Sequence, residues 1–263
     1  MKISGLTILR NAVDLSIPFV ASINSILPIC DEFVVVLGDS TDDTEKLLLS
    51  IGSPKIRIIK TIWDFKKYDR GGELLSRQTN IGKQACKGDW IFYLQGDEII
   101  HEDDLDWLKH ELEFYLNKKE IDGFSFKYLH FWGDADHYIF TDSTGMDMIR
   151  IVRNKKDIVS SSDAHLFVRK MSIFSLPTGI KTDLRVISSG CRIYHYSYVK
   201  PEKAQENRFL LYYKLYKGNK VLEKKEESIK KEGFTYGDLG SLPVFKGKHP
   251  KVIETYLKEL SGN

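Results

Sequence analysis

The first half of the chain alternates short runs of β-branched and apolar residues with longer segments in which apolar residues recur at helical spacing. The predicted strands are Ile3 to Leu9, Glu32 to Leu37, Lys55 to Lys60 and Trp90 to Leu94. The predicted helices are Asp14 to Leu27, Glu45 to Ile51, a stretch from Gly71 to near Gly88, and His101 to Leu116. Such alternation is typical of an α/β fold with a Rossmann-like, mostly parallel central sheet and helices on both faces.

Two segments carry the clearest signals. Trp90 to Leu94 is apolar without interruption, which favours a central parallel strand covered on both faces over an edge strand. In the segment after His101, Leu105, Leu108 and Leu112 share one helical face, and acidic residues occupy the first turn, where the helix dipole favours them. Together, these two segments predict a strand that leads directly into a helix.

The pattern changes after residue 122. Alternating aromatic residues from Phe124 and the run Met148 to Asn154 predict further strands, and a helix rich in Tyr and Leu begins at Pro201 and ends near Lys217. The mixed-charge stretch that follows predicts a solvated helix face or a mobile loop. We divide the chain into residues 1–122 and 123–200, two halves of one principal domain, and residues 201–263, a C-terminal helical extension and tail.

Composition narrows the class of protein. The 263 residues include 39 Lys and Arg against 37 Asp and Glu, a net charge of +2 that does not favour a nucleic-acid partner. A local basic patch could still hold a diphosphate or contact an anionic membrane surface. Three cysteines, far apart, suggest neither a disulfide framework nor a CxxC metal site. With no signal peptide or membrane span recognised, we expect a cytoplasmic protein, with a location at the inner face of the membrane as the alternative.

Polar residues follow three of the predicted strands. Arg10 and Asn11 follow the first, Gly38 to Ser40 the second, and Gln95 to Glu98 the fourth. Ligands of parallel α/β sheets bind beyond the C-terminal ends of the strands, so these residues should meet at one crevice. A divalent cation would compensate a buried carboxylate there, and Asp97 is the better ligand because Glu98 should point the other way. Alternatively, both acids cap the helix that begins near His101.

Four segments, taken together, resemble the nucleotide-sugar-binding half of family 2 glycosyltransferases, which have the GT-A fold. They are TILRN at 7–11, VVLGDSTDDT at 35–44, QTNIGKQACKGDW at 78–90 and FYLQGDE at 92–98. The resemblance implies that the donor nucleotide is contacted by the first strand and its loop, by an acid after the second strand, and by the helix before the fourth. The residues implied are Thr7, Arg10, Asp39 or Asp42, Arg77 and Asn80.

The same resemblance implies that Gln95, Gly96 and Asp97 form the DxD-type element, in which the last acid holds Mn or Mg on the donor diphosphate. This chain departs from the family at two places. Gly38 stands where an acid is common, which shifts the nucleotide contact to Asp39 or Asp42. Gln95 replaces the first acid of the element, so metal binding depends on Asp97.

The second half resembles the same family at two short segments, SDAH at 162–165 and IYHY at 193–196. Attack on an anomeric carbon requires a deprotonated acceptor hydroxyl, and Asp163 is the candidate base. A turn or cap acid is the alternative. His195 is a candidate metal or diphosphate ligand, or else a hydrogen-bonded core residue. In the tail, Lys246, Lys248 and His249 could clamp phosphates or form an exposed charged turn.

These features and the resemblance predict a metal-dependent glycosyltransferase that uses Mn or Mg and a nucleotide-sugar donor, with a UDP-sugar the first choice. The resemblance implies that the enzyme inverts the anomeric centre. The acceptor could be a saccharide, a lipid-linked glycan or a protein, and the oligomeric state is left open. Two alternatives remain. A sugar nucleotidyltransferase would carry a glycine-rich loop after the first strand, and TILRNA contains no glycine. A non-catalytic sugar-nucleotide sensor or scaffold would bind the donor without transferring its sugar.

Overall fold

The computed structural model describes residues 1–68, 70–140, 147–164, 166–173, 176–217 and 219–262, and within these it contains one large sheet and one small sheet. The large sheet has nine strands, in the order β3-β2-β1-β4-β8-β6-β12-β5, with β7 paired to β6. Its strands are β1 (Ile3–Leu9), β2 (Glu32–Leu37), β3 (Ile56–Lys60), β4 (Trp90–Tyr93), β5 (Glu98–Ile100), β6 (Gly123–Trp132), β7 (Tyr138–Ile139), β8 (Met148–Arg153) and β12 (Val186–Tyr198).

The predicted α/β fold class, with a central sheet covered by helices, is confirmed. Strands β3, β2, β1 and β4 run parallel, and β8 joins β4 in antiparallel fashion, so the sheet is parallel in its first half and mixed in its second. All residues of β4 are buried between β1 and β8, as its apolar run predicted. Only one of the two neighbours of β4 is parallel to it. That neighbour is β1, whereas β8 runs in the opposite direction.

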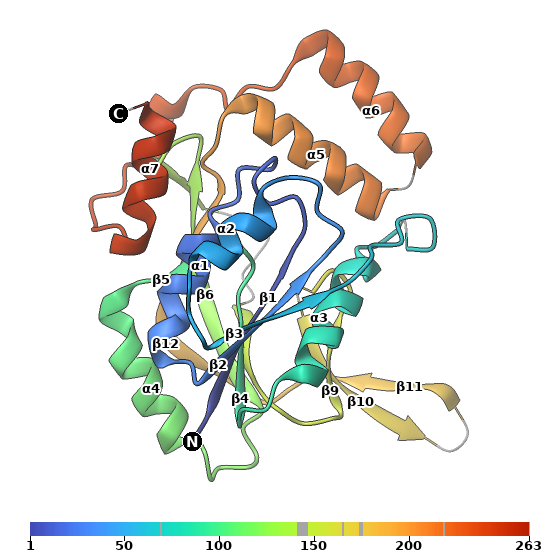
Figure 1. Cartoon of the computed structure of the whole chain (residues 1–263), viewed down its shortest axis with the longest axis vertical. Helices are drawn as coiled ribbons and strands as arrows, with labels where there is room; N and C mark the ends of the chain where they lie inside the picture. The colour runs from blue at the N-terminus through green and yellow to red at the C-terminus, as the bar shows by residue number, and fades with distance from the viewer. Residues whose placement is uncertain (69, 141–146, 165, 174–175, 218, 263) are drawn as a thin grey trace.

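Helices cover both faces of the large sheet (Figure 1). Their bounds are α1 (Phe19–Ile26), α2 (Thr44–Ser50), α3 (Glu73–Ala85) and α4 (Leu105–Phe114). On one face, Phe19, Ile23 and Leu108 join a large apolar core with Trp90 and Phe92. The opposite face of β1 and β4 forms a second core that includes Leu6 and Tyr93. Because successive side chains of a strand point to opposite faces, β1 and β4 pack against a core on each side of the sheet. This packing holds the ends of the two strands in place.

The chain was predicted to pass from β4 directly into a helix, and the structure differs from this prediction. The chain first forms the short strand β5, which pairs antiparallel with β12. A 3-10 turn, Glu102–Asp104, then leads into α4, and the His101 side chain caps it by accepting a hydrogen bond from Asp103 N at 3.2 Å. Asp97 and Glu98 are therefore not the caps of this helix.

The C-terminal part is helical, as predicted, with α5 (Glu202–Tyr216), α6 (Asn219–Glu232) and α7 (Glu254–Ser261). The mixed-charge stretch is thus a helix, α6, and not a loop. A small sheet of β9 (Ile158–Ser161), β10 (Leu166–Ile173) and β11 (Leu176–Thr182) was not predicted. In Figure 1, α5 and α6 lie beyond the end of the sheet opposite to the N-terminus. Within the described residues, no helix is both long and apolar enough to cross a bilayer.

Candidate active site

A pocket of about 240 Å³ opens at the C-terminal ends of β1 and β4, the place at which parallel sheets bind ligands. Helix α5 forms its opposite wall. The pocket brings together five residues predicted from the sequence, Arg10, Gln95, Gly96, Asp97 and Asp163. The other polar and aromatic lining residues are Trp63, Tyr93, Arg208, Tyr212 and Tyr216. Strand ends, the β9–β10 turn and α5, which are distant in the chain, thus converge on one cavity.

Asp97 is the most strongly held group in the pocket. Its side chain is 5% exposed, and its Oδ2 lies 2.9 Å from Arg208 Nη1 and 3.7 Å from His195 Nε2. Burial alone would raise the pKa of Asp97, but the charges of Arg208, His195 and Lys200 outweigh it and hold the pKa well below its usual range. Asp97 is therefore a carboxylate at neutral pH, and its main partner is a guanidinium.

The described residues do not form a donor set for the Mn or Mg predicted from the sequence. They contain no group of three His, Cys, Asp or Glu side chains that could hold a metal ion. The second candidate ligand, His195, faces His130, with 2.7 Å between their Nδ1 atoms. Burial, followed by the charge of His195, lowers the pKa of His130 to about 4, so this ring is neutral at pH 7. The DxD-type element of Gln95, Gly96 and Asp97 thus contains one carboxylate, that of Asp97, and this carboxylate is paired with Arg208.

Glu98 points away from Asp97, as the alternation along a strand requires. Its Oε2 accepts a hydrogen bond from Arg150 Nε and its Oε1 one from Arg150 Nη2, both at 2.7 Å, and Tyr128 donates to Oε1 at 2.6 Å. Gln95 N donates to the same carboxylate at 3.0 Å. Glu98 thus fixes the backbone of the Gln95 to Asp97 turn, and its role is structural.

Asp163 is presented by a strained turn. Its neighbours Ser162 and Ala164 both have positive φ, 58° and 63°, a conformation that costs free energy in residues with a Cβ and often marks functional sites. A Cβ on Gly72 would lie 2.5 Å from Asp163 Cβ, so only glycine allows this close approach. Tyr216 Oη donates to Asp163 Oδ2 at 3.0 Å. The turn, the glycine and the phenol together fix the carboxylate in the pocket wall.

Arg10 lines the pocket and pairs with Asp39, which is not among the lining residues, with 2.9 Å between Arg10 Nε and Asp39 Oδ1. Asp39 also accepts a hydrogen bond from Trp63 N at 3.1 Å. A Cβ on Gly38 would lie 2.5 Å from Trp63 Nε1, so a larger residue at this position would require Trp63 to move. Trp63, which sequence reasoning missed, is buried, and its Nε1 has no hydrogen-bond partner among the described residues.

The remaining predicted nucleotide contacts do not line this pocket. Thr7 is fully buried inside β1. Asp42 accepts hydrogen bonds from the backbone N–H groups of Val13 and Asp14, both at 2.9 Å, and so shapes the loop after β1. Arg77 packs over the ring of Tyr68, with 4.2 Å from its Cζ to the ring centroid. These three predicted roles stay predictions.

Asn80 is also placed away from the pocket. It joins α3 to β9, because its Nδ2 donates to Ser160 O at 2.9 Å and its Oδ1 accepts from Ser160 N at 2.8 Å. We expect Asn80→Ala to lower the free energy of unfolding by about 1–3 kcal/mol, since two buried backbone groups lose their partner, and to leave UDP affinity unchanged. Urea unfolding and calorimetric titration check this, with the exposed Gln84→Ala on the same helix as control. A large loss of UDP affinity at normal stability would restore the nucleotide contact inferred from the sequence.

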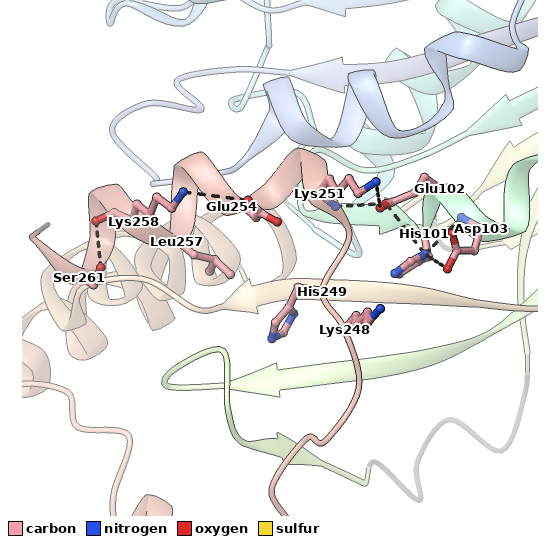
Figure 2. A pocket seen from close by; sticks show the side chains of 10 residues that line it. All are labelled: His101, Glu102, Asp103, Lys248, His249, Lys251, Glu254, Leu257, Lys258 and Ser261. Carbon is pink, nitrogen blue, oxygen red and sulfur yellow. Dashed lines mark hydrogen bonds and ion pairs between the residues drawn. The ribbon is translucent and has the colours of Figure 1, made fainter.

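A second, larger cleft of about 580 Å³ lies beside α7 (Figure 2). Its charged groups pair with one another, since Lys251 Nζ and Lys258 Nζ each lie 4.0 Å from a glutamate oxygen, of Glu102 and Glu254 respectively. Two residues of the predicted phosphate clamp, Lys248 and His249, line this cleft and not the Asp97 pocket. Tyr196 Oη lies 2.7 Å from His249 Nδ1, which anchors the tail here. A role for this tail as a phosphate clamp stays a prediction.

Comparisons with known proteins give structural likenesses only. No protein-family model and no curated protein matches the chain. Residues 1–349 of S. aureus TarS match with a TM-score of 0.47 and 16% identity, over 80% of this chain and 64% of that one. The same fragment in complex with UDP-GlcNAc gives 0.45 and 16%, over 80% and 65%. Glucosyl-3-phosphoglycerate synthase from Mycobacterium tuberculosis, in complex with Mn2+, UDP and phosphoglyceric acid, gives 0.33 and 25%, over 48% and 43%. The chain spans less than two thirds of the length of each.

Proposed function

We propose that this protein is a glycosyltransferase that moves a sugar from a nucleotide-sugar donor to an acceptor hydroxyl. One observation carries the proposal: a single pocket at the C-terminal ends of β1 and β4 holds a fixed carboxylate, Asp163, together with the guanidinium groups of Arg10 and Arg208. Such a pocket combines a group that can accept a proton with groups that can bind a diphosphate. The motif resemblance in the first half of the chain gives the same assignment.

In the proposed reaction, the donor diphosphate lies against Arg208 and Arg10, and the acceptor hydroxyl lies against Asp163. Asp163 takes the hydroxyl proton as the oxygen attacks the anomeric carbon, and the bond from that carbon to the diphosphate breaks. The guanidinium groups stabilise the negative charge that develops on the departing nucleoside diphosphate. Attack from the face opposite to the leaving group inverts the anomeric centre, the outcome implied by the family resemblance.

Tyr216 and Gly72 would keep Asp163 in the orientation that this step needs. Burial and the adjacent Asp163 raise the pKa of Tyr216 far above its usual value, so the phenol stays protonated and donates its hydrogen bond throughout the pH range of an assay. The hydrogen bond from Tyr216 holds the Asp163 carboxylate in the pocket wall, where an acceptor hydroxyl can reach it. The predicted Mn or Mg would have to displace Arg208 from Asp97, and no step of this reaction requires it.

The test is a thermal-shift screen of UDP, GDP, CDP and dTDP sugars, with UDP-sugars first, followed by an assay for sugar transfer and for slow donor hydrolysis. Donor-specific stabilisation reports binding to the folded state. We expect one nucleotide to raise the melting temperature and its sugar to be transferred or hydrolysed. Binding with neither reaction would favour the non-catalytic sensor, and stabilisation by none of the four would reject a nucleotide-sugar site.

A further inference from the structure

A guanidinium group fills the position next to Asp97 at which a DxD-type carboxylate would receive a divalent cation. Arg208 comes from α5, the helix that walls the pocket, and its Nη1 lies 2.9 Å from Asp97 Oδ2. The same nitrogen donates to Ser197 O at 2.8 Å. A backbone carbonyl on β12 therefore fixes the guanidinium at the carboxylate, and the contact is not a loose surface pair.

The side chains around Asp97 supply few of the oxygen ligands that would complete a metal shell. Mn and Mg prefer several oxygen ligands, often including more than one carboxylate. Gln95 carries no charge, and Glu98 is bound by both Arg150 and Tyr128. His195 Nδ1 faces His130, and its Nε2 lies 3.7 Å from Asp97 Oδ2, so this ring could add one nitrogen ligand at most. Asp97 is left as a single carboxylate that already has a cationic partner.

The balance of charge around Asp97 also disfavours a further cation. Lys200 is also buried, and its Nζ donates to Leu15 O at 2.7 Å. The positive charges of Arg208 and Lys200 both act on Asp97. A divalent ion placed beside Asp97 would therefore meet electrostatic repulsion from these two groups. Arg10, on the pocket wall, adds another positive group.

We propose that this protein binds the diphosphate of its donor through Arg208, in the position that a divalent cation takes in metal-dependent enzymes, and that binding needs no metal. The proposal rests on the proposed function. Asp97 then orients Arg208 and is not a metal ligand. Arginine suits this role because its planar group is always charged and can bind a carboxylate and a phosphate at the same time.

The test is a calorimetric titration of the wild-type protein with UDP, once in EDTA and once in excess Mn. We expect the two dissociation constants to agree within about twofold, a difference of less than 0.5 kcal/mol. Arg208→Ala should weaken UDP binding in EDTA by about 10- to 100-fold, the range for loss of a charge-assisted hydrogen bond. Lys203→Ala, which removes an exposed positive charge from the same helix, is the matched control and should bind as wild type.

Because Arg208→Ala leaves the buried Asp97 unpaired, its fold is checked by circular dichroism, and the double variant Arg208→Ala/Asp97→Asn removes both charges together. This double variant should show the same loss of UDP affinity. UDP binding that requires Mn, or full affinity of the double variant in EDTA, would overturn the metal-free role while leaving the proposed function intact. If UDP, GDP, CDP and dTDP all fail to bind with and without Mn, the proposed function fails as well.

Discussion

Asp163→Asn is expected to lower the rate of sugar transfer by about two to four orders of magnitude, the range for removal of a general base, while the affinity for the donor nucleotide stays near that of wild type. Asparagine keeps the shape of the side chain and can still accept the hydrogen bond from Tyr216, so the fold should not change. What it loses is the ability to take a proton. Steady-state kinetics with the donor found in the screen, together with calorimetry, separate the two effects.

The control for this prediction is Asp106→Asn, which changes an exposed acid in the first turn of α4 and should leave the rate unchanged. A near-normal transfer rate for Asp163→Asn would show that another group accepts the proton. A loss of donor affinity equal to the loss of rate would show that Asp163 binds the donor. Either result would remove Asp163 from the proposed role.

Arg150→Met is expected to lower the free energy of unfolding by about 3–5 kcal/mol, the cost of leaving one member of a buried ion pair without its partner. Arg150 and Glu98 are 2% and 1% exposed, and two hydrogen bonds of 2.7 Å join them. Without Arg150, the carboxylate of Glu98 would be buried with Tyr128 and Gln95 N as its remaining donors among the described residues. Urea unfolding followed by circular dichroism measures the change.

Two further variants make the assignment specific. Arg150→Met/Glu98→Gln removes both charges and should recover a large part of the lost stability, because the neutral amide is cheaper to bury. Lys258→Ala breaks an exposed ion pair in α7 and should cost less than about 0.5 kcal/mol. If Arg150→Met were no more destabilising than Lys258→Ala, the ion pair would not support the turn at Asp97.

The elements that could be predicted from the sequence are those whose burial depends on residues close together in the chain. The uninterrupted apolar run at Trp90 to Leu94 identified a central strand, and the polar residues after it line a pocket at the C-terminal end of that strand. The expectation that Asp97 and Glu98 face opposite ways also follows from strand geometry alone. These features depend on neighbouring residues, so one segment of sequence contains enough information to predict them.

The partners of these residues could not be predicted in the same way. Arg208 reaches Asp97 from a helix far along the chain, and the Tyr and Leu content of α5 indicated a helix without showing which side chain enters the pocket. Trp63 reaches Asp39 from a loop with no periodic pattern. The strained turn at Asp163 depends on Gly72, which the sequence placed only at a helix start. Tertiary contacts of this kind carry no signal in sequence spacing.

The claim that the pocket at β1 and β4 binds the donor is tested most directly by hydrogen exchange, with the nucleotide that stabilises the protein most in the screen. We predict slower exchange in residues 8–17, 95–97 and 203–216, which line or flank this pocket, and no change in residues 248–258, which line the larger cleft. Slower exchange confined to residues 248–258, or no change in the three pocket segments at saturating nucleotide, would contradict the assignment.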